Sequence, residues 1–166
     1  MTGRRAALLA AALASAAALA PPAPSRAQDI TRAQPRLPTE PLAILTRDGR
    51  RHEFTVEMAT RHEQQVVGLM FRREVRPDEG MLFDWGLPER ESAMWMRNTL
   101  VPLDMVFIQG DGRVRRIAER TVPLSLATVE SGGPVRATLE LAGGTAERLG
   151  LRAGDRVLHR IFGTAP

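Results

Sequence analysis

The residues best suited to chemistry lie in one stretch, residues 94–104, with the sequence MWMRNTLVPLD. This stretch holds one of the two tryptophans of the chain and its only asparagine. It ends on Asp104, which interrupts a segment that is otherwise apolar. A charged group in such a place is costly unless it is paired. The stretch is therefore either a binding site or a structural clamp.

Two interpretations stay open for this stretch. In the first, it builds a polar pocket whose floor is Trp95. The specific contacts of that pocket are Arg97, Asn98 and Asp104. In the second, Asn98, Thr99 and Asp104 fix a turn, since buried polar groups usually serve to satisfy backbone. Arg97 then neutralises Asp104.

The sequence lacks the residue types and motifs that most catalytic mechanisms need. The chain has no Cys and no Lys, which excludes disulfides, thiolate metal sites, a Cys nucleophile and a Schiff base. No nucleophile elbow surrounds a serine, and no G-x-G-x-x-G is present. We therefore assign no catalytic residue and expect no cofactor. One enzymatic alternative is a hydrolase in which Asp104 and Glu140 share acid–base work across a cleft.

A second alternative is a Cu(I) site. Met94 and Met96 flank Trp95, and thioethers are ligands that suit Cu(I). An indole face can also stabilise a cation. Alternating methionines in a strand are, however, also typical of residues that fill gaps in a core.

The N-terminus has the pattern of an export signal. Arg4 and Arg5 precede an apolar run over residues 6–20, and small residues at 25 and 27 allow a cut before Gln28. The apolar run is shorter than the roughly 20 residues that span a bilayer, although an uncleaved leader would still act as an anchor. We expect a signal peptide over residues 1–27 and a periplasmic or secreted protein.

The charge of the chain does not indicate nucleic-acid binding. The pI of about 11.2 follows from having arginine but no Lys, Tyr or Cys. Three of the 23 basic residues lie in the leader and none of the 19 acidic residues does, so the remainder is nearly neutral. Counterion release on DNA needs a clustered basic face. We expect a monomer that binds a small molecule or a protein, and membrane contact only through an uncleaved leader.

The elements that position these residues are mainly strands. Residues 28–41 hold three prolines among polar residues and are expected to form a flexible leader outside the core. An apolar run at 42–45, the turn signal Asp48-Gly49 and an alternation over 53–58 predict a hairpin. A helix is predicted over 61–73, opened by a capping box at Thr60 and Glu63.

The rest of the chain, up to residue 162, continues the same domain. Its predicted strands cover residues 81–85, 93–97, 103–109, 113–122, 135–141 and 156–162, with a short helix after Gly143-Gly144. Many short strands with few helices indicate an α+β fold. We expect one globular domain over residues 42–162, a β-dominated small sheet or barrel-like domain with one or two short helices.

An ordered set of motifs carries a resemblance to a known family. The motifs are GLMFR at 68–72, GMLF at 80–83, WMRNT at 95–99, PLD at 102–104, and LELAGG at 139–144. Together they resemble the bacterial and archaeal family called domain of unknown function 192, over about residues 42–162. The resemblance implies an exported or membrane-tethered protein and brings no agreed biochemical role. Arg97 stands where many members have Lys.

The resemblance also marks which residues form the motif. Within it, the ligand-binding candidates are Trp95, Arg97, Asn98, Thr99, Asp104, Arg72 and Glu140. The sequence thus favours an exported, non-enzymatic ligand- or partner-binding module with a cleft around Trp95–Asp104.

Overall fold

The computed structural model describes residues 30–164. The signal peptide expected over residues 1–27 lies outside the described residues. Within them, no helix is long and apolar enough to cross a membrane.

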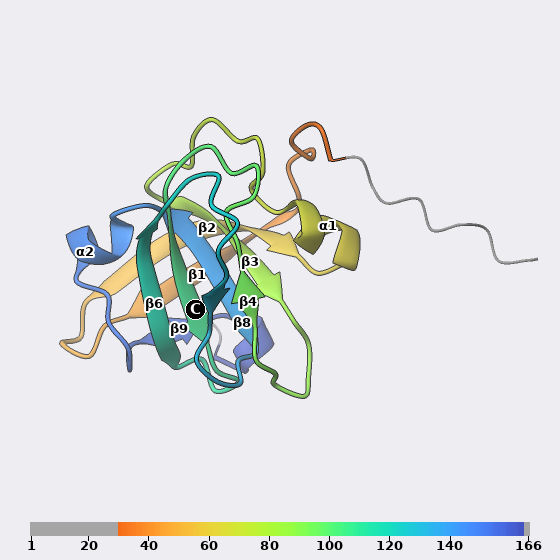
Figure 1. Cartoon of the computed structure of the whole chain (residues 1–166). Coiled ribbons are helices and arrows are strands. Elements are labelled where there is room, and N and C mark those ends of the chain that lie inside the picture. The colour runs from red at the N-terminus through yellow and green to blue at the C-terminus, as the bar shows by residue number, and fades with distance from the viewer. Residues whose placement is uncertain (1–29, 165–166) are drawn as a thin grey trace, which may run out of the picture.

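One seven-stranded sheet dominates the fold (Figure 1). Its strand order is β6-β5-β8-β3-β2-β1-β9, and every neighbouring pair is antiparallel except β2 and β3. The strands of this sheet are β1 (Thr39–Leu45), β2 (Arg51–Ala59), β3 (Glu79–Asp84), β5 (Leu103–Ile108), β6 (Val114–Thr121), β8 (Ala137–Ala142) and β9 (Arg156–Leu158). A two-stranded ribbon of β4 (Ala93–Met94) and β7 (Val129–Glu130) completes the strands. The predicted β-dominated α+β domain is confirmed.

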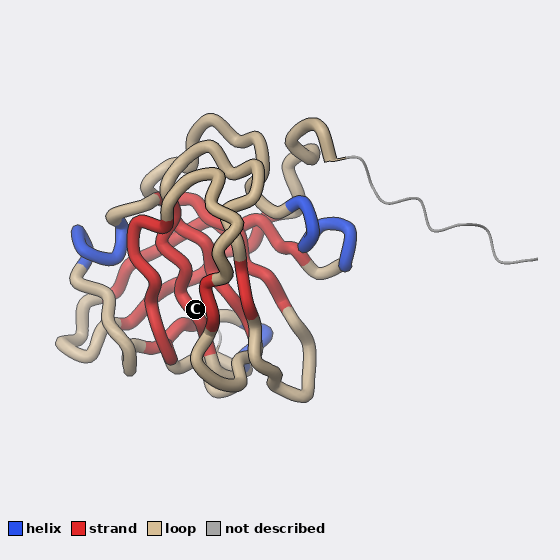
Figure 2. Tube along the Cα trace, in the orientation of Figure 1, coloured by secondary structure: helices blue, strands red, loops and turns tan. Residues whose placement is uncertain are grey.

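The sheet curls until its two edge strands meet. Val114 at the start of β6 donates its N–H to the carbonyl of Asp155 at 2.8 Å, and Val157 of β9 donates to the carbonyl of Gly112 at 2.7 Å. Figure 2 shows the strands as one curved layer, with short helices at its margins. These are α1 (His62–Val67), α2 (Thr145–Leu149) and the 3-10 turn η1 (Arg160–Phe162).

The two faces of the sheet carry separate apolar clusters. The inner cluster draws residues from all seven strands, among them Leu139 and Leu141 of β8. The outer cluster lies on β3 and β5 and includes Met81 and Met105, covered by Met94 and its neighbours. Because side chains alternate along a strand, Glu140 projects from β8 on the side opposite Leu139 and Leu141. The central strands therefore have no solvent-facing side.

Several elements follow the sequence pattern. The hairpin of β1 and β2 is confirmed, with its turn at Asp48-Gly49, where the Thr46 hydroxyl donates to the Asp48 carboxylate at 2.5 Å. The central strand expected near residue 103 is also confirmed, since every residue of β5 is buried.

Other boundaries differ from the sequence expectation, and the helix predicted over 61–73 is one of them. It ends at Val67 because Gly68 takes a positive φ of 50°. Its start is capped by the Gln64 side chain, which accepts from the N–H groups of Thr60 and Arg61, rather than by a Thr60–Glu63 box. The expected strand at 93–97 is two residues long, and the expected last strand is replaced after residue 158 by η1.

The expected flexible leader also needs correction for its described part. β1 begins at Thr39, three residues before the expected start of the domain. Before it, the Gln34 side chain donates to the carbonyls of Gln64 and Gly68 at 3.1 and 2.9 Å, and Leu37 packs on the outer cluster. These contacts join residues 34–38 to the domain.

Asp104 is a structural clamp. It is fully buried, and its carboxylate accepts the N–H groups of Arg120, Gly144 and Ala146 at 2.8, 3.0 and 2.7 Å. Arg120 has a positive φ of 46° where the pairing of β5 with β6 shifts register. One carboxylate thus ties an irregularity in β6 to the start of α2, in the charge-assisted geometry that makes such bonds strong.

This clamp generates a stability prediction. Asp104→Ala leaves three N–H groups without an acceptor, one of them buried and two part-buried, which we expect to lower the free energy of unfolding by about 3–5 kcal/mol. Urea denaturation followed by circular dichroism measures the loss. The control is Asp111→Ala, because Asp111 is exposed and accepts one N–H, from Arg113 at 2.9 Å. Equal stabilities of the two variants would contradict the clamp.

Candidate functional site

The four buried carboxylates of residues 30–164 are Glu57, Asp104, Glu140 and Asp155. Asp104 has the three N–H partners described above. Asp155 accepts the N–H groups of Arg47 and Arg152 at 3.0 and 2.7 Å. Each of these two side chains satisfies backbone at a chain reversal, as buried polar groups usually do.

Glu57 is paired in a different way. Its carboxylate accepts from Arg72 at 3.0 Å and from the N–H of Leu37 at 2.8 Å. Only 14% of the Arg72 side chain is exposed, so this ion pair lies largely out of solvent. The pair fixes the segment after α1 to β2, which explains Arg72 as a structural residue.

Glu140 alone lacks such partners among the described residues. It is 4% exposed, and within residues 30–164 its carboxyl group has neither a hydrogen bond nor an ion pair. Its neighbours across β3 and β5 are Met81 and Met105, both fully buried. Burial raises the pKa of Glu140 to about 8, because the charged form loses its hydration without gaining a partner.

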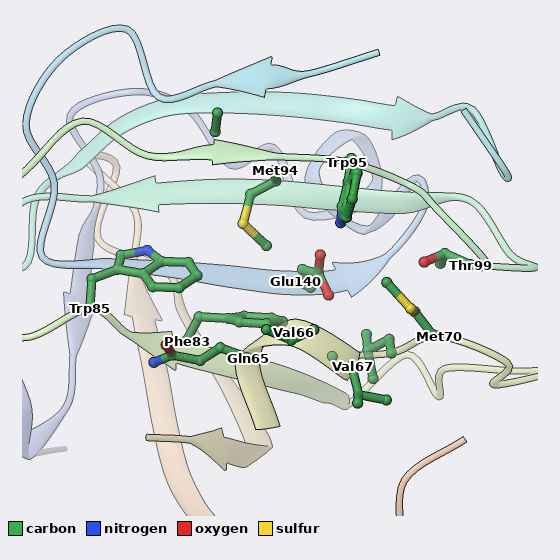
Figure 3. Close-up of a pocket in the computed structure, with 13 residues that line it drawn as sticks. Gln65, Val66, Val67, Met70, Phe83, Trp85, Met94, Trp95, Thr99 and Glu140 are labelled. Atoms are coloured by element: carbon green, nitrogen blue, oxygen red, sulfur yellow. The ribbon is translucent and has the colours of Figure 1, made fainter. Parts of the chain in front are cut away.

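The carboxyl group of Glu140 reaches into a pocket of about 170 Å³. Figure 3 shows Glu140 at the centre of the lining side chains, with Trp95 on one side and Phe83 and Val66 on the other. The lining comes from α1, β3, β4 and β8 and from the loops that follow α1, β3 and β4. Its residues are Gln65, Val66, Val67, Gly68, Leu69, Met70, Phe83, Trp85, Ala93, Met94, Trp95, Thr99 and Glu140. Glu140 is the one titratable group in this lining.

Aromatic rings form much of the wall. Phe83 and Trp85 stack with centroids 5.5 Å apart, and the Trp85 indole donates to the Thr138 hydroxyl at 3.0 Å. Gly68 is required beside them, since a Cβ there would lie 3.0 Å from the Phe83 ring. Trp95 is 43% exposed and marks the edge of the pocket. Both tryptophans of the chain thus line this pocket.

Hydrogen bonds hold the α1 wall in place. The Gln65 side chain donates to the carbonyls of Ala59 and Asp84 at 3.1 and 2.8 Å. Gln34 binds two carbonyls at the other end of the helix, as described above. No residue of α1 is buried, so these side-chain amides, rather than a buried apolar face, fix its position.

Three of the sequence candidates meet at the pocket, namely Trp95, Thr99 and Glu140. Arg97 is exposed and lies over the Trp95 ring, with its guanidinium carbon 5.5 Å from the ring centroid. The interpretation that Arg97 neutralises Asp104 is corrected, because backbone N–H groups satisfy that carboxylate.

Asn98 has a conformational role. It takes a positive φ of 55°, which Asn tolerates better than most residues. Its carbonyl accepts from the N–H of Phe71 at 2.8 Å, and its side-chain amide lies 3.9 Å from the Met70 sulfur. The only asparagine of the chain therefore joins its loop to the segment after α1.

The acid–base pair of the hydrolase alternative is not formed. Across β5 and β8, Asp104 is opposite Leu141, and Met105 is opposite Glu140. Paired residues share a face of a sheet and successive residues alternate. The two carboxyl groups therefore lie on opposite faces and cannot act on one bond.

The two methionines of the copper alternative belong to the same outer cluster. Only Met94 also lines the pocket, whereas the Met96 sulfur lies 3.1 Å from the Thr121 hydroxyl. No group of three His, Cys, Asp or Glu side chains that could hold a metal occurs within residues 30–164. The methionine that joins Met94 at the pocket is Met70.

Sequence reasoning missed part of the wall. Trp85 and Met70 are not among the sequence candidates, and Phe83 belongs only to a predicted alternating strand and to the GMLF motif. That alternation places Phe83 and Glu140 on one face once the pairing of β3 with β8 is known. Since pairing partners lie almost sixty residues apart in the chain, the local pattern could not supply that step.

The fold and this pocket define a class of protein, a curled β-domain that holds one unpaired carboxyl group in an aromatic pocket. Comparisons with known proteins identify its family. The family model DUF192, described as uncharacterized ACR, matches residues 43–159. The chain belongs to the DUF192 family, and the resemblance drawn from the motifs is confirmed.

Two solved structures share this fold. One is a protein of Sinorhizobium meliloti 1021, provisionally described as a transcription regulator, with 45% identity and a TM-score of 0.74 over 78% of this chain and 99% of that one. The other is a protein of unknown function from Novosphingobium aromaticivorans DSM 12444, with 41% identity and a TM-score of 0.70 over 74% of this chain and 86% of that one. No curated protein matches the chain.

The raised pKa of Glu140 generates a pH-dependent prediction. In the unfolded chain the carboxyl ionises near its usual pKa of 4.5, whereas the folded chain keeps the proton up to about pH 8. As pH rises between these values the unfolded state loses a proton that the folded state holds, so the fold loses stability, by about 5 kcal/mol at most. Glu140→Gln removes this loss, and we expect it to be more stable than the wild type at pH 9 and nearly equal to it at pH 5.

Thermal unfolding at the two pH values measures the difference. The control Glu63→Gln makes the same chemical change on an exposed residue of α1 and should shift neither melting temperature. An advantage of Glu140→Gln that is the same at pH 5 and pH 9 would contradict a desolvated carboxyl.

Proposed function

We propose that this protein is an exported, non-enzymatic module that binds a small ligand in the pocket of Glu140. The observation that carries the proposal is the unpaired carboxyl at the pocket floor. An unsatisfied buried polar group lowers stability, and the three other buried carboxylates all have partners. A ligand that supplies the missing partner gives this group a role.

Binding fits the pocket better than catalysis does. A general acid needs a base, a nucleophile or a charge-stabilising group beside it. The lining has one titratable group, and the Gln65 amide is engaged by two carbonyls. Asp104, the acid that the hydrolase alternative pairs with Glu140, lies on the other face of the sheet. A carboxyl without a catalytic partner can still select and hold a ligand.

A role in transcription, as in the description of the Sinorhizobium protein, has less support here. Nine arginines of residues 30–164 form ion pairs with carboxylates. The charge beyond the leader is nearly balanced, and DNA binding depends on a surplus of basic groups on one face. The export pattern of residues 1–27 also favours a site outside the cytoplasm.

Export is tested by the N-terminus of the purified protein. Expressed in full in a Gram-negative host, the chain should collect in the periplasmic fraction and start at Gln28 by intact mass. Deletion of residues 2–27 should leave it in the cytoplasm. A full-length chain in the cytoplasm would contradict export without affecting the pocket.

The binding site is tested by a fragment screen on the isotope-labelled chain that lacks residues 1–27. Because both tryptophans line the pocket, bound fragments should shift both indole N–H resonances. Val66→Phe fills the pocket from the α1 wall and should abolish these shifts, since Val66 lines it. The matched control His62→Phe, on the exposed side of the same helix, should keep them. Fragments that bind equally to both variants would place the site elsewhere.

A further inference from the structure

The proposed binding pocket also indicates the chemical class of its ligand, and this inference rests on the proposed function. We propose that the pocket of Glu140 takes a primary organic ammonium ion, with the Glu140 carboxylate as its ionic partner and the aromatic rings as its walls.

The charge of the lining disfavours an anionic ligand. Glu140 is the one titratable side chain among the thirteen lining residues, and none of them is basic. Arg97 lies over Trp95 but is not part of the lining. An anion would meet a carboxyl group with no cation to offset it. A cation, by contrast, supplies the missing partner and removes the cost of the buried charge.

The walls favour a cation over a neutral ligand. Phe83, Trp85 and Trp95 line the pocket, and the faces of aromatic rings attract cations within about 6 Å. Trp95 already receives one, since the Arg97 guanidinium lies over its ring. A neutral ligand would use these rings as apolar surface only and would leave the carboxyl either protonated or uncompensated.

The second polar contact favours a primary ammonium. The Thr99 hydroxyl lines the pocket and donates to the carbonyl of Arg97 at 3.3 Å, so its lone pairs can accept a hydrogen bond from a ligand. A primary ammonium has three donors, enough for Glu140 and Thr99 together. A quaternary ammonium has none and would leave Thr99 without a ligand contact.

The pocket volume limits the ligand to a short chain. About 170 Å³ is less than the roughly 300 Å³ at which pockets for drug-sized ligands begin. A free alkylamine fits, and so does a lysine side chain of a partner protein. A second copy of this chain cannot supply that side chain, because the sequence contains no lysine.

Ammonium binding must displace the proton of Glu140. The groups that face its carboxyl are Met81 of β3, Met105 of β5, Met94 of β4, Val66 of α1 and, beside these, Trp95. None of them is charged or titrates, so no other group takes up the proton. At a pH below the raised pKa of Glu140, the ammonium forms an ion pair with the carboxylate and one proton passes to solvent.

The experiment compares three probes of similar length, n-butylammonium, n-butanol and butyrate, on the chain that lacks residues 1–27. Tryptophan fluorescence gives the dissociation constants, since both indoles line the pocket. We expect n-butylammonium to bind at least tenfold more tightly than either other probe at pH 8.5. Its affinity should fall roughly 80-fold at pH 6, where the carboxyl is protonated.

Two variants assign the effect to the pocket. Glu140→Gln should lose the preference for n-butylammonium and its pH dependence, whereas Glu63→Gln should keep both. Thr99→Val should weaken n-butylammonium several-fold and leave n-butanol unchanged, which a merely structural role of Thr99 would not do. Thermal unfolding shows whether each variant is folded under the conditions of the titration.

The outcomes separate the inference from the proposed function. If n-butanol binds as tightly as n-butylammonium to the wild type and to Glu140→Gln, the pocket binds ligands but the ammonium inference is overturned. Tighter binding of butyrate overturns it as well. If no probe binds, the proposed function fails with it. If Nα-acetyl-lysine methylamide binds tenfold more tightly than n-butylammonium, the ligand is a lysine side chain of a partner protein. If the two bind equally tightly, the ligand is a free amine.

Discussion

Alternation of side chains along β5 and β8 is the constraint on which the rest of this structure depends. Both strands lie inside the curled sheet, each between two neighbouring strands, and are buried on both faces. A shift of one residue in either strand would exchange every inward and outward side chain. The observed register directs Leu139 and Leu141 into the curl and Glu140 out of it. It also places Asp104 among backbone N–H groups and Met105 beside the pocket acid. One register thus assigns a clamp to one face and a candidate site to the other.

Burial alone does not distinguish a structural acid from a functional one, whereas the partners do. Asp104 and Glu140 have nearly the same low exposure, yet their environments differ completely. Asp104 lies at the start of β5, near two irregular segments whose free N–H groups converge on it. Glu140 lies in mid-strand between two methionines, where the strand backbones bond to each other and side chains are the remaining source of partners. The fold stabilises the first charge and leaves the second to be stabilised by something else.

The sequence was sufficient for the local elements and insufficient for the site. Turn chemistry at Asp48-Gly49, together with period-two alternation, was enough to predict the first hairpin, because those signals act between near neighbours. Helix α1 was predicted too long, since Val66, Leu69 and Met70 continue the helical spacing beyond Gly68 although the backbone turns there. Trp95 and Thr99 could be proposed from their motif. That Asp104 faces away from them depends on the pairing of β5 with β8, and that Arg72 pairs with Glu57 depends on the packing of a loop on a distant strand.

The α1 wall connects the ordered N-terminal segment to the site. The helix has six residues, and none is buried; helices of this length are not stable by themselves. Its position therefore depends on its side-chain tethers, Gln65 to the carbonyls of Ala59 and Asp84 and Gln34 to those of Gln64 and Gly68. Such part-buried hydrogen bonds at the margin of the fold open at a lower free energy than apolar packing in a core. The strands β3 and β8 form the rigid floor that carries Glu140, whereas α1 is the wall that can move at the lowest cost. A ligand that reaches Glu140 would therefore lie between a carboxyl group fixed by the sheet and a helix held in part by residues 34–38. These residues belong to the segment that would remain after an export leader is removed.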